Sequence, residues 1–178
     1  TAPLCTYLHG AGSGAGRSDG MNSSQSKIFG IGLSKTGTTS LARALEILGY
    51  KTRDYLGVTS YSAGDLSSID LDMIDTNDAF TDTPIPSFYR ELDVRYPGSK
   101  FILTIRDMDG WLKSCKKQFT QKLAEKLNQA SNQLFIDIYG CAVFDEQKFR
   151  RGYADFPGGV EQHFKNRPQD LLIMDIAA

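Results

Sequence analysis

Short apolar runs alternate along this chain with segments whose apolar residues recur at helical spacing. The unbroken runs predict three buried strands, at 27–32, 101–106 and 171–176. Weaker strand signals lie at 50–56 and 79–81. Because strand and helix patterns alternate, the sequence predicts an α/β domain of three layers, in which a central parallel sheet has helices on both faces.

Helical patterns occupy the segments between these runs. Leu41, Leu45 and Leu48 repeat at helical spacing, and Gly49 is expected to end that helix. Shorter helices are predicted at 65–74 and at 87–96. A longer apolar stripe predicts further helices before the last strand, and it comprises Leu112, Cys115, Phe119, Leu123, Leu127, Leu134 and Ile138.

The first 26 residues differ in composition from the rest of the chain. Residues 10–20 read Gly-Ala-Gly-Ser-Gly-Ala-Gly-Arg-Ser-Asp-Gly, the composition of a flexible linker. Met21 stands directly after this stretch. We interpret residues 1–26 as a tag or linker or as a native disordered arm, and residues 27–178 as the folded domain.

Charge and cysteine content exclude several classes of protein. The 20 basic and 21 acidic residues give a net charge of -1, so nucleic acid is not an expected partner and any anion site has to be built locally. No stretch approaches the roughly 20 apolar residues of a membrane helix. The three cysteines are widely spaced, which suits reduced thiols in the cytoplasm and gives no metal-ligand spacing. Cys115 and Cys141 are expected to be core residues.

A glycine-rich turn joins the first strand to the first helix. Gly32 to Thr39 reads Gly-Leu-Ser-Lys-Thr-Gly-Thr-Thr, with two glycines five residues apart as in a Walker A loop. Such glycines let several backbone N–H groups face inward, and the following helix adds its partial positive charge. The turn therefore predicts a phosphate site.

The position of the lysine decides between two kinds of phosphate loop. A Walker A loop has lysine directly after the second glycine, where this chain has Thr38. The only lysine of the Gly32–Thr39 loop is Lys35, two residues before that glycine. The core Lys35-Thr36-Gly37-Thr38-Thr39 resembles the phosphosulfate loop of the sulfotransferase superfamily, with Thr36 in place of Ser and Ser34 in place of Pro. Ser40 stands where cytosolic members often carry Trp. The resemblance implies a P-loop NTPase-like fold and nucleotide contacts from Lys35, Thr36, Gly37, Thr38, Thr39 and Ser40.

A second element of the resemblance follows the central strand. Arg106 closes the run Phe101-Ile102-Leu103-Thr104-Ile105, and Ser114 lies eight residues later. The family binds the 3′-phosphate of its nucleotide with an Arg and a Ser at this spacing. Arg106 would present a planar fork of donors at the carboxyl end of a strand, where α/β proteins place ligands. Lys113, Lys116 and Lys117 are expected to be a solvated helix face.

The catalytic base is the least direct of these assignments. Cytosolic sulfotransferases carry a catalytic His roughly two dozen residues before the phosphate-binding Arg, and the corresponding position here is Asp82, in Thr81-Asp82-Thr83-Pro84. His163 is expected to be exposed, and His9 lies in the N-terminal arm. Asp82 is therefore the candidate base, although it could instead cap the helix entered through Pro84; Asp78 and Tyr89 are reserve candidates.

By resemblance, the chain is a sulfotransferase most similar to the compact bacterial-type domains over Lys27 to Ile176. The donor would be 3′-phosphoadenosine 5′-phosphosulfate (PAPS), Lys35 would act on charge at the leaving phosphate, no metal would be needed, and the acceptor would be a small molecule or a glycan. Family members extend well past the last strand, so activity without that region is left open. The alternatives are a P-loop kinase or NTPase, with Asp175 as a Mg²⁺ ligand, and a non-catalytic nucleotide-binding protein.

Overall fold

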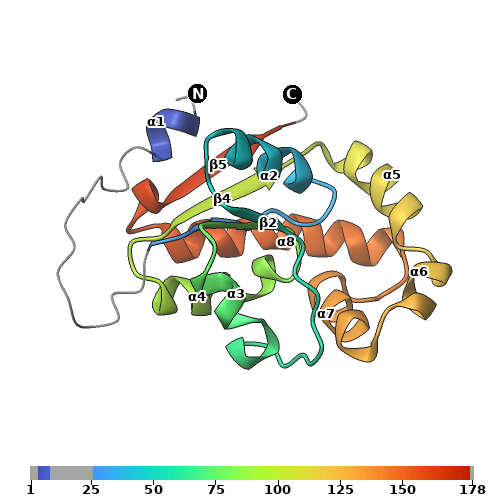
Figure 1. Cartoon of the computed structure of the whole chain (residues 1–178). Coiled ribbons are helices and arrows are strands. Elements are labelled where there is room, and N and C mark those ends of the chain that lie inside the picture. The colour runs from blue at the N-terminus through green and yellow to red at the C-terminus, as the bar shows by residue number, and fades with distance from the viewer. Residues whose placement is uncertain (1–3, 9–25, 177–178) are drawn as a thin grey trace.

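In the computed structural model, which describes residues 4–8 and 26–176, five strands form one parallel sheet (Figure 1). The strands are β1 (Ile28–Gly30), β2 (Thr52–Asp54), β3 (Ala79–Thr81), β4 (Lys100–Ile105) and β5 (Leu171–Asp175). Their order across the sheet is β2-β3-β1-β4-β5, and each neighbouring pair is parallel. The first strand therefore lies in the middle of the sheet, and the turn that follows it lies at the centre of the carboxyl edge.

Helices cover both faces of this sheet, so the predicted three-layer α/β/α architecture is confirmed (Figure 1). The α-helices are α1 (Leu4–Leu8), α2 (Thr38–Ile47), α3 (Leu71–Asp75), α4 (Tyr89–Arg95), α5 (Met108–Gln118), α6 (Gln121–Lys126), α7 (Gln129–Tyr139) and α8 (Glu146–Phe164). Three 3-10 turns lie at η1 (Leu66–Ser68), η2 (Ile85–Phe88) and η3 (Pro168–Asp170).

Alternate side chains of the central strands enter different cores. Ile28, Ala79 and Ile102 pack with α2 on one face, whereas Phe29 and Phe80 join the larger core on the face of α4 and α8. A third cluster surrounds Trp111 and links α5, α7 and α8 beside the sheet. Successive side chains of a strand point to opposite faces of the sheet, so each central strand contributes residues to the cores on both faces.

The short helix α1 packs against the α2 face of the sheet. Leu8 is buried beside Ile28 and Ile102, and the Tyr7 hydroxyl donates to the Phe101 carbonyl over 3.3 Å. The low-complexity stretch at 10–20 lies outside the described residues. The composition of residues 1–26 separates them from the domain, yet α1, which belongs to this segment, contacts the core of the domain.

The prediction that the strand at 171–176 is buried is wrong. The segments 27–32 and 101–106 are buried or nearly so, but β5 is only half-buried and Ile173 is 41% exposed. β5 is the edge strand of the described sheet and pairs only with β4 there. Its apolar residues still contact both cores, Leu171 on one face and Met174 on the other, which accounts for the unbroken apolar run.

The helix predictions need smaller corrections. The segments 65–74 and 87–96 each divide into a 3-10 turn and a short α-helix. The helix after the loop ends as predicted, because Gly49 follows its C-cap residue Leu48 and has φ of 92°, in the left-handed region. The long helix α8 was not predicted. His163 lies in it and is partly buried rather than exposed, because its Nε2 lies 2.8 Å from Asp93 Oδ2 on α4.

Candidate functional site

The glycine-rich turn is held against β4 by the absence of a side chain at Gly32. A Cβ on Gly32 would lie 1.8 Å from Thr104 Oγ1, so only glycine fits this position. The Thr36 hydroxyl is buried against the same threonine, with 2.6 Å between the two oxygens, and it lies 2.6 Å from the Leu33 carbonyl oxygen. The predicted nucleotide residue Thr36 therefore uses its hydroxyl to shape the loop.

The second glycine starts the helix that points at the loop. Gly37 has φ of 100°, in the left-handed region, and is the N-cap residue of α2 with no side-chain hydrogen bond to the helix. The first turn of α2 contains no acidic residue. Its N–H groups and dipole are thus directed at the loop, as an anion site requires. Lys35, which is exposed with φ of 73°, precedes this helix end.

Asp82 faces the loop from the end of β3. Its Oδ1 accepts from the Ser34 hydroxyl over 2.6 Å and from the Thr83 N–H over 2.7 Å, and its Oδ2 accepts from the Thr38 hydroxyl over 2.9 Å. Asp82 has φ of 63°, in the left-handed region that Asp adopts more readily than most residues. The alternative of a helix cap is wrong, because η2 has Pro84 as its N-cap and no side-chain cap.

The reserve candidates lie elsewhere. Asp78 precedes β3, so it sits at the amino edge of the parallel sheet, where its Oδ2 accepts from the Lys51 N–H over 2.8 Å. Tyr89 is buried in the core beside α8, with its ring edge against His163. Asp82 is therefore the candidate base that contacts the loop.

The end of the loop contacts β2. The Thr39 hydroxyl donates to Asp54 Oδ2 over 2.9 Å, and the Thr81 hydroxyl donates to Asp54 Oδ1 over 2.7 Å. Ser40 is exposed in the first turn of α2, and its side chain makes no hydrogen bond within the described part of the chain. Of the two residues, Thr39 is fixed by the fold and Ser40 is open to a ligand.

Arg106 and Ser114 meet, as their spacing predicts. Arg106 Nη1 donates to Ser114 Oγ over 3.2 Å, because Asp107 caps α5 and the serine lies two turns along that helix. The Arg106 backbone is fixed by Tyr153 of α8, whose hydroxyl accepts from its N–H and donates to its carbonyl, each over 2.7 Å. This pair and the loop share the carboxyl edge of neighbouring strands β4 and β1.

Comparison with protein families identifies the domain that carries this geometry. The model of the sulfotransferase domain matches residues 27–178. The chain belongs to the sulfotransferase family. No curated protein matches this sequence significantly.

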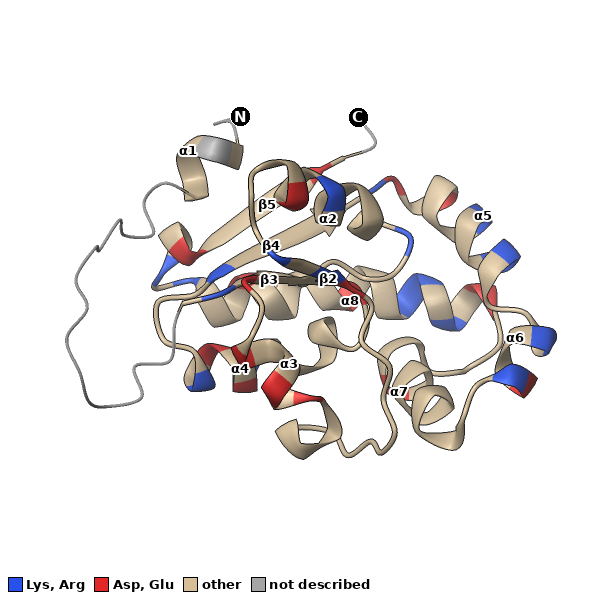
Figure 2. Ribbon diagram, in the orientation of Figure 1, with Lys and Arg blue, Asp and Glu red and all other residues tan. Residues whose placement is uncertain are grey.

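Cys115 is a buried thiol in α5 of this sulfotransferase domain. Burial raises the pKa of Cys115 to about 12, and the positive charges of Lys35 and Arg106 oppose that rise. Cys115 is thus an unreactive core thiol, as the sequence predicts. Elsewhere basic and acidic residues are interspersed over the helices (Figure 2), so the attraction for an anion is local.

Sequence reasoning missed the residues that support the loop from α5, α7 and α8. Trp111 Nε1 donates to the Ser34 carbonyl over 2.9 Å, and the Trp111 ring stacks on Tyr153 with centroids 4.2 Å apart. Tyr139 of α7 packs beside Trp111, with ring centroids 6.1 Å apart, and burial raises the pKa of its hydroxyl. An isolated aromatic residue in a helical stripe gives no sign in the sequence that it serves a distant loop.

The described residues contain neither a metal-binding cluster nor a membrane-spanning helix. No group of three or more His, Cys, Asp or Glu side chains in residues 4–8 and 26–176 could hold a metal ion. Within the same ranges, no helix combines the length and the apolar character needed to cross a bilayer. Lys113, Lys116 and Lys117 are exposed, as expected for the solvated face of α5.

Proposed function

We propose that this domain transfers a sulfuryl group from PAPS to an acceptor hydroxyl or amine. The observation that carries the proposal is the Arg106–Ser114 pair beside the loop. The loop alone suits any phosphate, but a fork of donors on the neighbouring strand supplies a second anion site. A nucleotide with phosphate groups at both its 5′ and 3′ positions would use both sites.

The loop residues act on the donor end of the reaction. The N–H groups at the start of α2 and the Lys35 ammonium bind the phosphosulfate, while the Thr38 hydroxyl lies between this helix end and Asp82. As the bond between sulfur and the bridging oxygen breaks, negative charge grows on the leaving phosphate. Lys35 and the N–H groups stabilise that charge, which is the general role of preorganised donors in such transfers.

Asp82 acts on the acceptor end. A new bond forms between the acceptor oxygen or nitrogen and sulfur, and the acceptor proton passes to the Asp82 carboxylate. The carboxylate is already oriented by Ser34, Thr38 and Thr83, so it stands next to the loop before any acceptor binds. The products are the sulfated acceptor and 3′-phosphoadenosine 5′-phosphate.

The same chemistry needs no metal, and none of the proposed steps uses one. The free thiols Cys115 and Cys141 suit a reducing compartment, and we place the reaction in the cytoplasm on that ground. A small molecule or a glycan would serve as the acceptor.

The proposal is tested by comparing nucleotides in a thermal-shift or calorimetric titration. We expect 3′-phosphoadenosine 5′-phosphate to bind more tightly than ADP, by about 1.5–3 kcal/mol for the charge-assisted contact with the 3′-phosphate. Arg106→Ala should remove most of this preference, and Lys113→Ala, an exposed position on α5, should keep it.

Two results would contradict the proposal. One is equal binding of both nucleotides, and the other is an unchanged preference in Arg106→Ala. Tighter binding of ATP with Mg²⁺ than of 3′-phosphoadenosine 5′-phosphate would indicate a kinase or NTPase instead.

A further inference from the structure

The two proposed anion sites lie beyond the part of the sheet in which their strands are paired with each other. The register of β1 with β4 runs from Ile28 to Gly30, and Gly30 lies opposite Ile102. Ser34 of the loop follows Gly30 by four residues, and Arg106 follows Ile102 by four. The separation of the loop from Arg106 therefore depends on side-chain contacts made past the paired residues.

One set of such contacts is a pair of stacked aromatic rings, Trp111 of α5 and Tyr153 of α8. Their centroids lie 4.2 Å apart, with 27° between the ring planes. Trp111 is fully buried and Tyr153 nearly so, and the Phe149 ring packs against Trp111 with centroids 5.8 Å apart. Because side chains in such a cluster are closely packed, the two rings have little freedom to move.

Each ring of the pair carries one polar group, and the two groups reach different anion sites. Trp111 Nε1 donates to the Ser34 carbonyl over 2.9 Å. The Tyr153 hydroxyl accepts from the Arg106 N–H and donates to the Arg106 carbonyl, each over 2.7 Å. Burial raises the pKa of Tyr153, so its hydroxyl keeps the proton that it donates. The stack thus joins the main chain of the loop to the main chain of Arg106.

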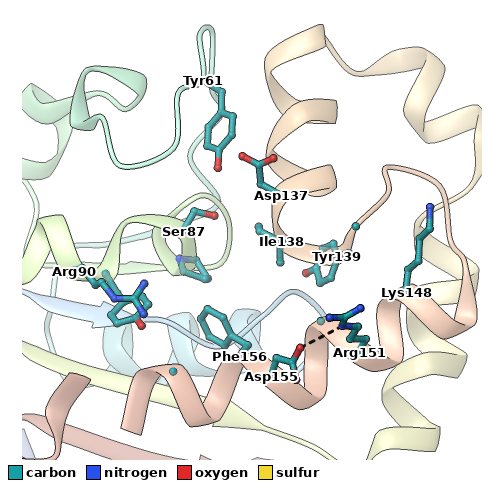
Figure 3. Close-up of a pocket in the computed structure, with 15 residues that line it drawn as sticks. Tyr61, Ser87, Arg90, Asp137, Ile138, Tyr139, Lys148, Arg151, Asp155 and Phe156 are labelled. Atoms are coloured by element: carbon teal, nitrogen blue, oxygen red, sulfur yellow. Dashed lines mark ion pairs between the residues drawn. The ribbon is translucent and has the colours of Figure 1, made fainter. Parts of the chain in front are cut away.

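A cavity of about 600 Å³, bordered by α4, α7 and α8, lies beside this cluster (Figure 3). Tyr139 and Phe156 are among the described residues that line it, whereas Trp111 and Tyr153 are not. The Tyr139 hydroxyl is buried and makes no hydrogen bond within the described part of the chain. Tyr139 therefore belongs to the aromatic cluster without connecting it to either anion site.

We propose that Trp111 and Tyr153 are positioning residues, which set the separation of the two anion sites and thereby the preference for a nucleotide with a 3′-phosphate. The inference rests on the proposed function, because it explains how that site distinguishes nucleotides. A nucleotide with phosphate groups at both ends uses both sites fully only when their separation matches its own length. ADP uses the loop alone, so its binding is insensitive to that separation.

The first test is Tyr153→Phe, which retains the ring of the stack and removes both hydrogen bonds to Arg106. 3′-Phosphoadenosine 5′-phosphate and ADP are titrated into the full chain by calorimetry. We expect 3′-phosphoadenosine 5′-phosphate to bind about tenfold more weakly than to wild type. Binding of ADP should stay within about twofold, because the loop retains its contact with Trp111.

The second test is Trp111→Phe, alone and combined with Tyr153→Phe. The single variant loses the donor to Ser34, so both nucleotides should bind more weakly, and 3′-phosphoadenosine 5′-phosphate should be affected more than ADP. Once the separation is no longer set, a second change has less to remove. Tyr153→Phe should therefore cost less than about threefold in 3′-phosphoadenosine 5′-phosphate affinity when Trp111→Phe is already present. The same cycle measured with ADP should show no coupling.

Tyr139→Phe is the matched control, because it removes a buried hydroxyl from the same cluster without removing a contact to either site. It should bind both nucleotides as wild type does. Denaturant unfolding of all variants records their stability. A merely structural role of the stack would weaken both nucleotides alike, in step with the loss of stability.

Several results would overturn this inference. They are equal weakening of both nucleotides in Tyr153→Phe, an unchanged affinity for 3′-phosphoadenosine 5′-phosphate in that variant, additive effects in the double variant, or the same loss of preference in Tyr139→Phe. Tyr153→Phe decides the question by itself if Trp111→Phe does not fold. Failure of the proposed function has a different signature, because the wild-type chain would then bind 3′-phosphoadenosine 5′-phosphate no more tightly than ADP.

Discussion

At the scale of single residues, three threonines of the loop each use their side-chain hydroxyl in a different hydrogen bond. Thr36 turns to Thr104 and Leu33, Thr39 turns to Asp54, and Thr38 turns to Asp82. Because these hydroxyl groups are already held by fixed partners, little free energy is spent on reorganising them when a ligand binds. Three neighbouring threonines with the same side chain thus have three different surroundings, and only that of Thr38 includes the candidate base.

The role of Asp82 is tested by Asp82→Asn, which preserves size. Its amide oxygen can still accept from Ser34, and its NH2 group can donate to the Thr38 hydroxyl, which then becomes the acceptor. We expect binding of 3′-phosphoadenosine 5′-phosphate to remain within a few-fold of wild type, because the loop is otherwise unchanged. Turnover should fall by about 10²–10⁴-fold, the usual range for a positioned base. Steady-state kinetics with PAPS, together with nucleotide titration, separates the two quantities.

A different pattern would assign Asp82 to loop geometry alone. Ser34→Ala removes one hydrogen bond from the carboxylate and serves as the matched control. If Asp82→Asn weakened nucleotide binding as much as turnover, or behaved like Ser34→Ala, the base assignment would be wrong.

At the scale of elements, α8 connects most parts of the molecule and is the element that sequence patterns could not predict. Gly152, Pro157, Gly158 and Gly159 interrupt its helical signal, since glycine and proline are poor helix formers. Gly152 is required by packing, because a Cβ there would lie 2.8 Å from the Ile138 carbonyl of α7. The loop and the Arg106–Ser114 pair could be predicted because their chemistry is local in sequence, whereas α8 depends on contacts with distant segments.

The contact between α8 and α4 makes a pH-dependent contribution to stability. Asp93 is nearly buried and accepts from His163 and from both terminal nitrogens of Arg167. Burial raises the pKa of Asp93, but the hydrogen bonds from Arg167 and His163 outweigh it, so the pKa lies below its usual value. A depressed pKa stabilises the fold above the unfolded value near 4, and this contribution is lost as the pH falls through the folded value.

Asp93→Asn should therefore lower the free energy of unfolding at pH 7 by about 1–3 kcal/mol. The variant should also lose less stability than wild type as the pH falls below about 4, because it has no carboxylate to protonate there. Denaturant unfolding at several pH values measures both effects. Glu161→Gln, an exposed position on α8, is the control, and parallel stability curves for Asp93→Asn and wild type would refute the prediction.

At the scale of the whole molecule, the fold class followed from the alternation of strands and helices, but the order of the strands did not. Nothing in the apolar run at 171–176 indicates that β5 lies at the edge, because contact with two cores and full burial produce the same pattern. The low-complexity stretch at 10–20 likewise led us to separate the preceding residues from the domain, although Leu8 of α1 is only 2% exposed. Both features depend on tertiary packing.

The division of the chain at residue 26 leads to a prediction about this packing. A chain that starts at Met21 should fold cooperatively and keep its preference for 3′-phosphoadenosine 5′-phosphate over ADP. It should lose about 1.5–3 kcal/mol of stability, the value of burying one leucine side chain. In the full chain, Leu8→Ala should reproduce most of this loss and Thr6→Ala, which is exposed, should not. Unchanged stability on truncation would show that α1 contributes nothing to the domain.

The double hydrogen bond between Tyr153 and Arg106 has a consequence for the proposed 3′-phosphate site. Tyr153 lies on α8, and Val160 and Phe164 of the same helix are buried in the core on one face of the sheet. The backbone of Arg106 is therefore fixed by a helix that the core holds in place. A substitution that displaced α8 would also displace Arg106, although it touched neither the loop nor the nucleotide.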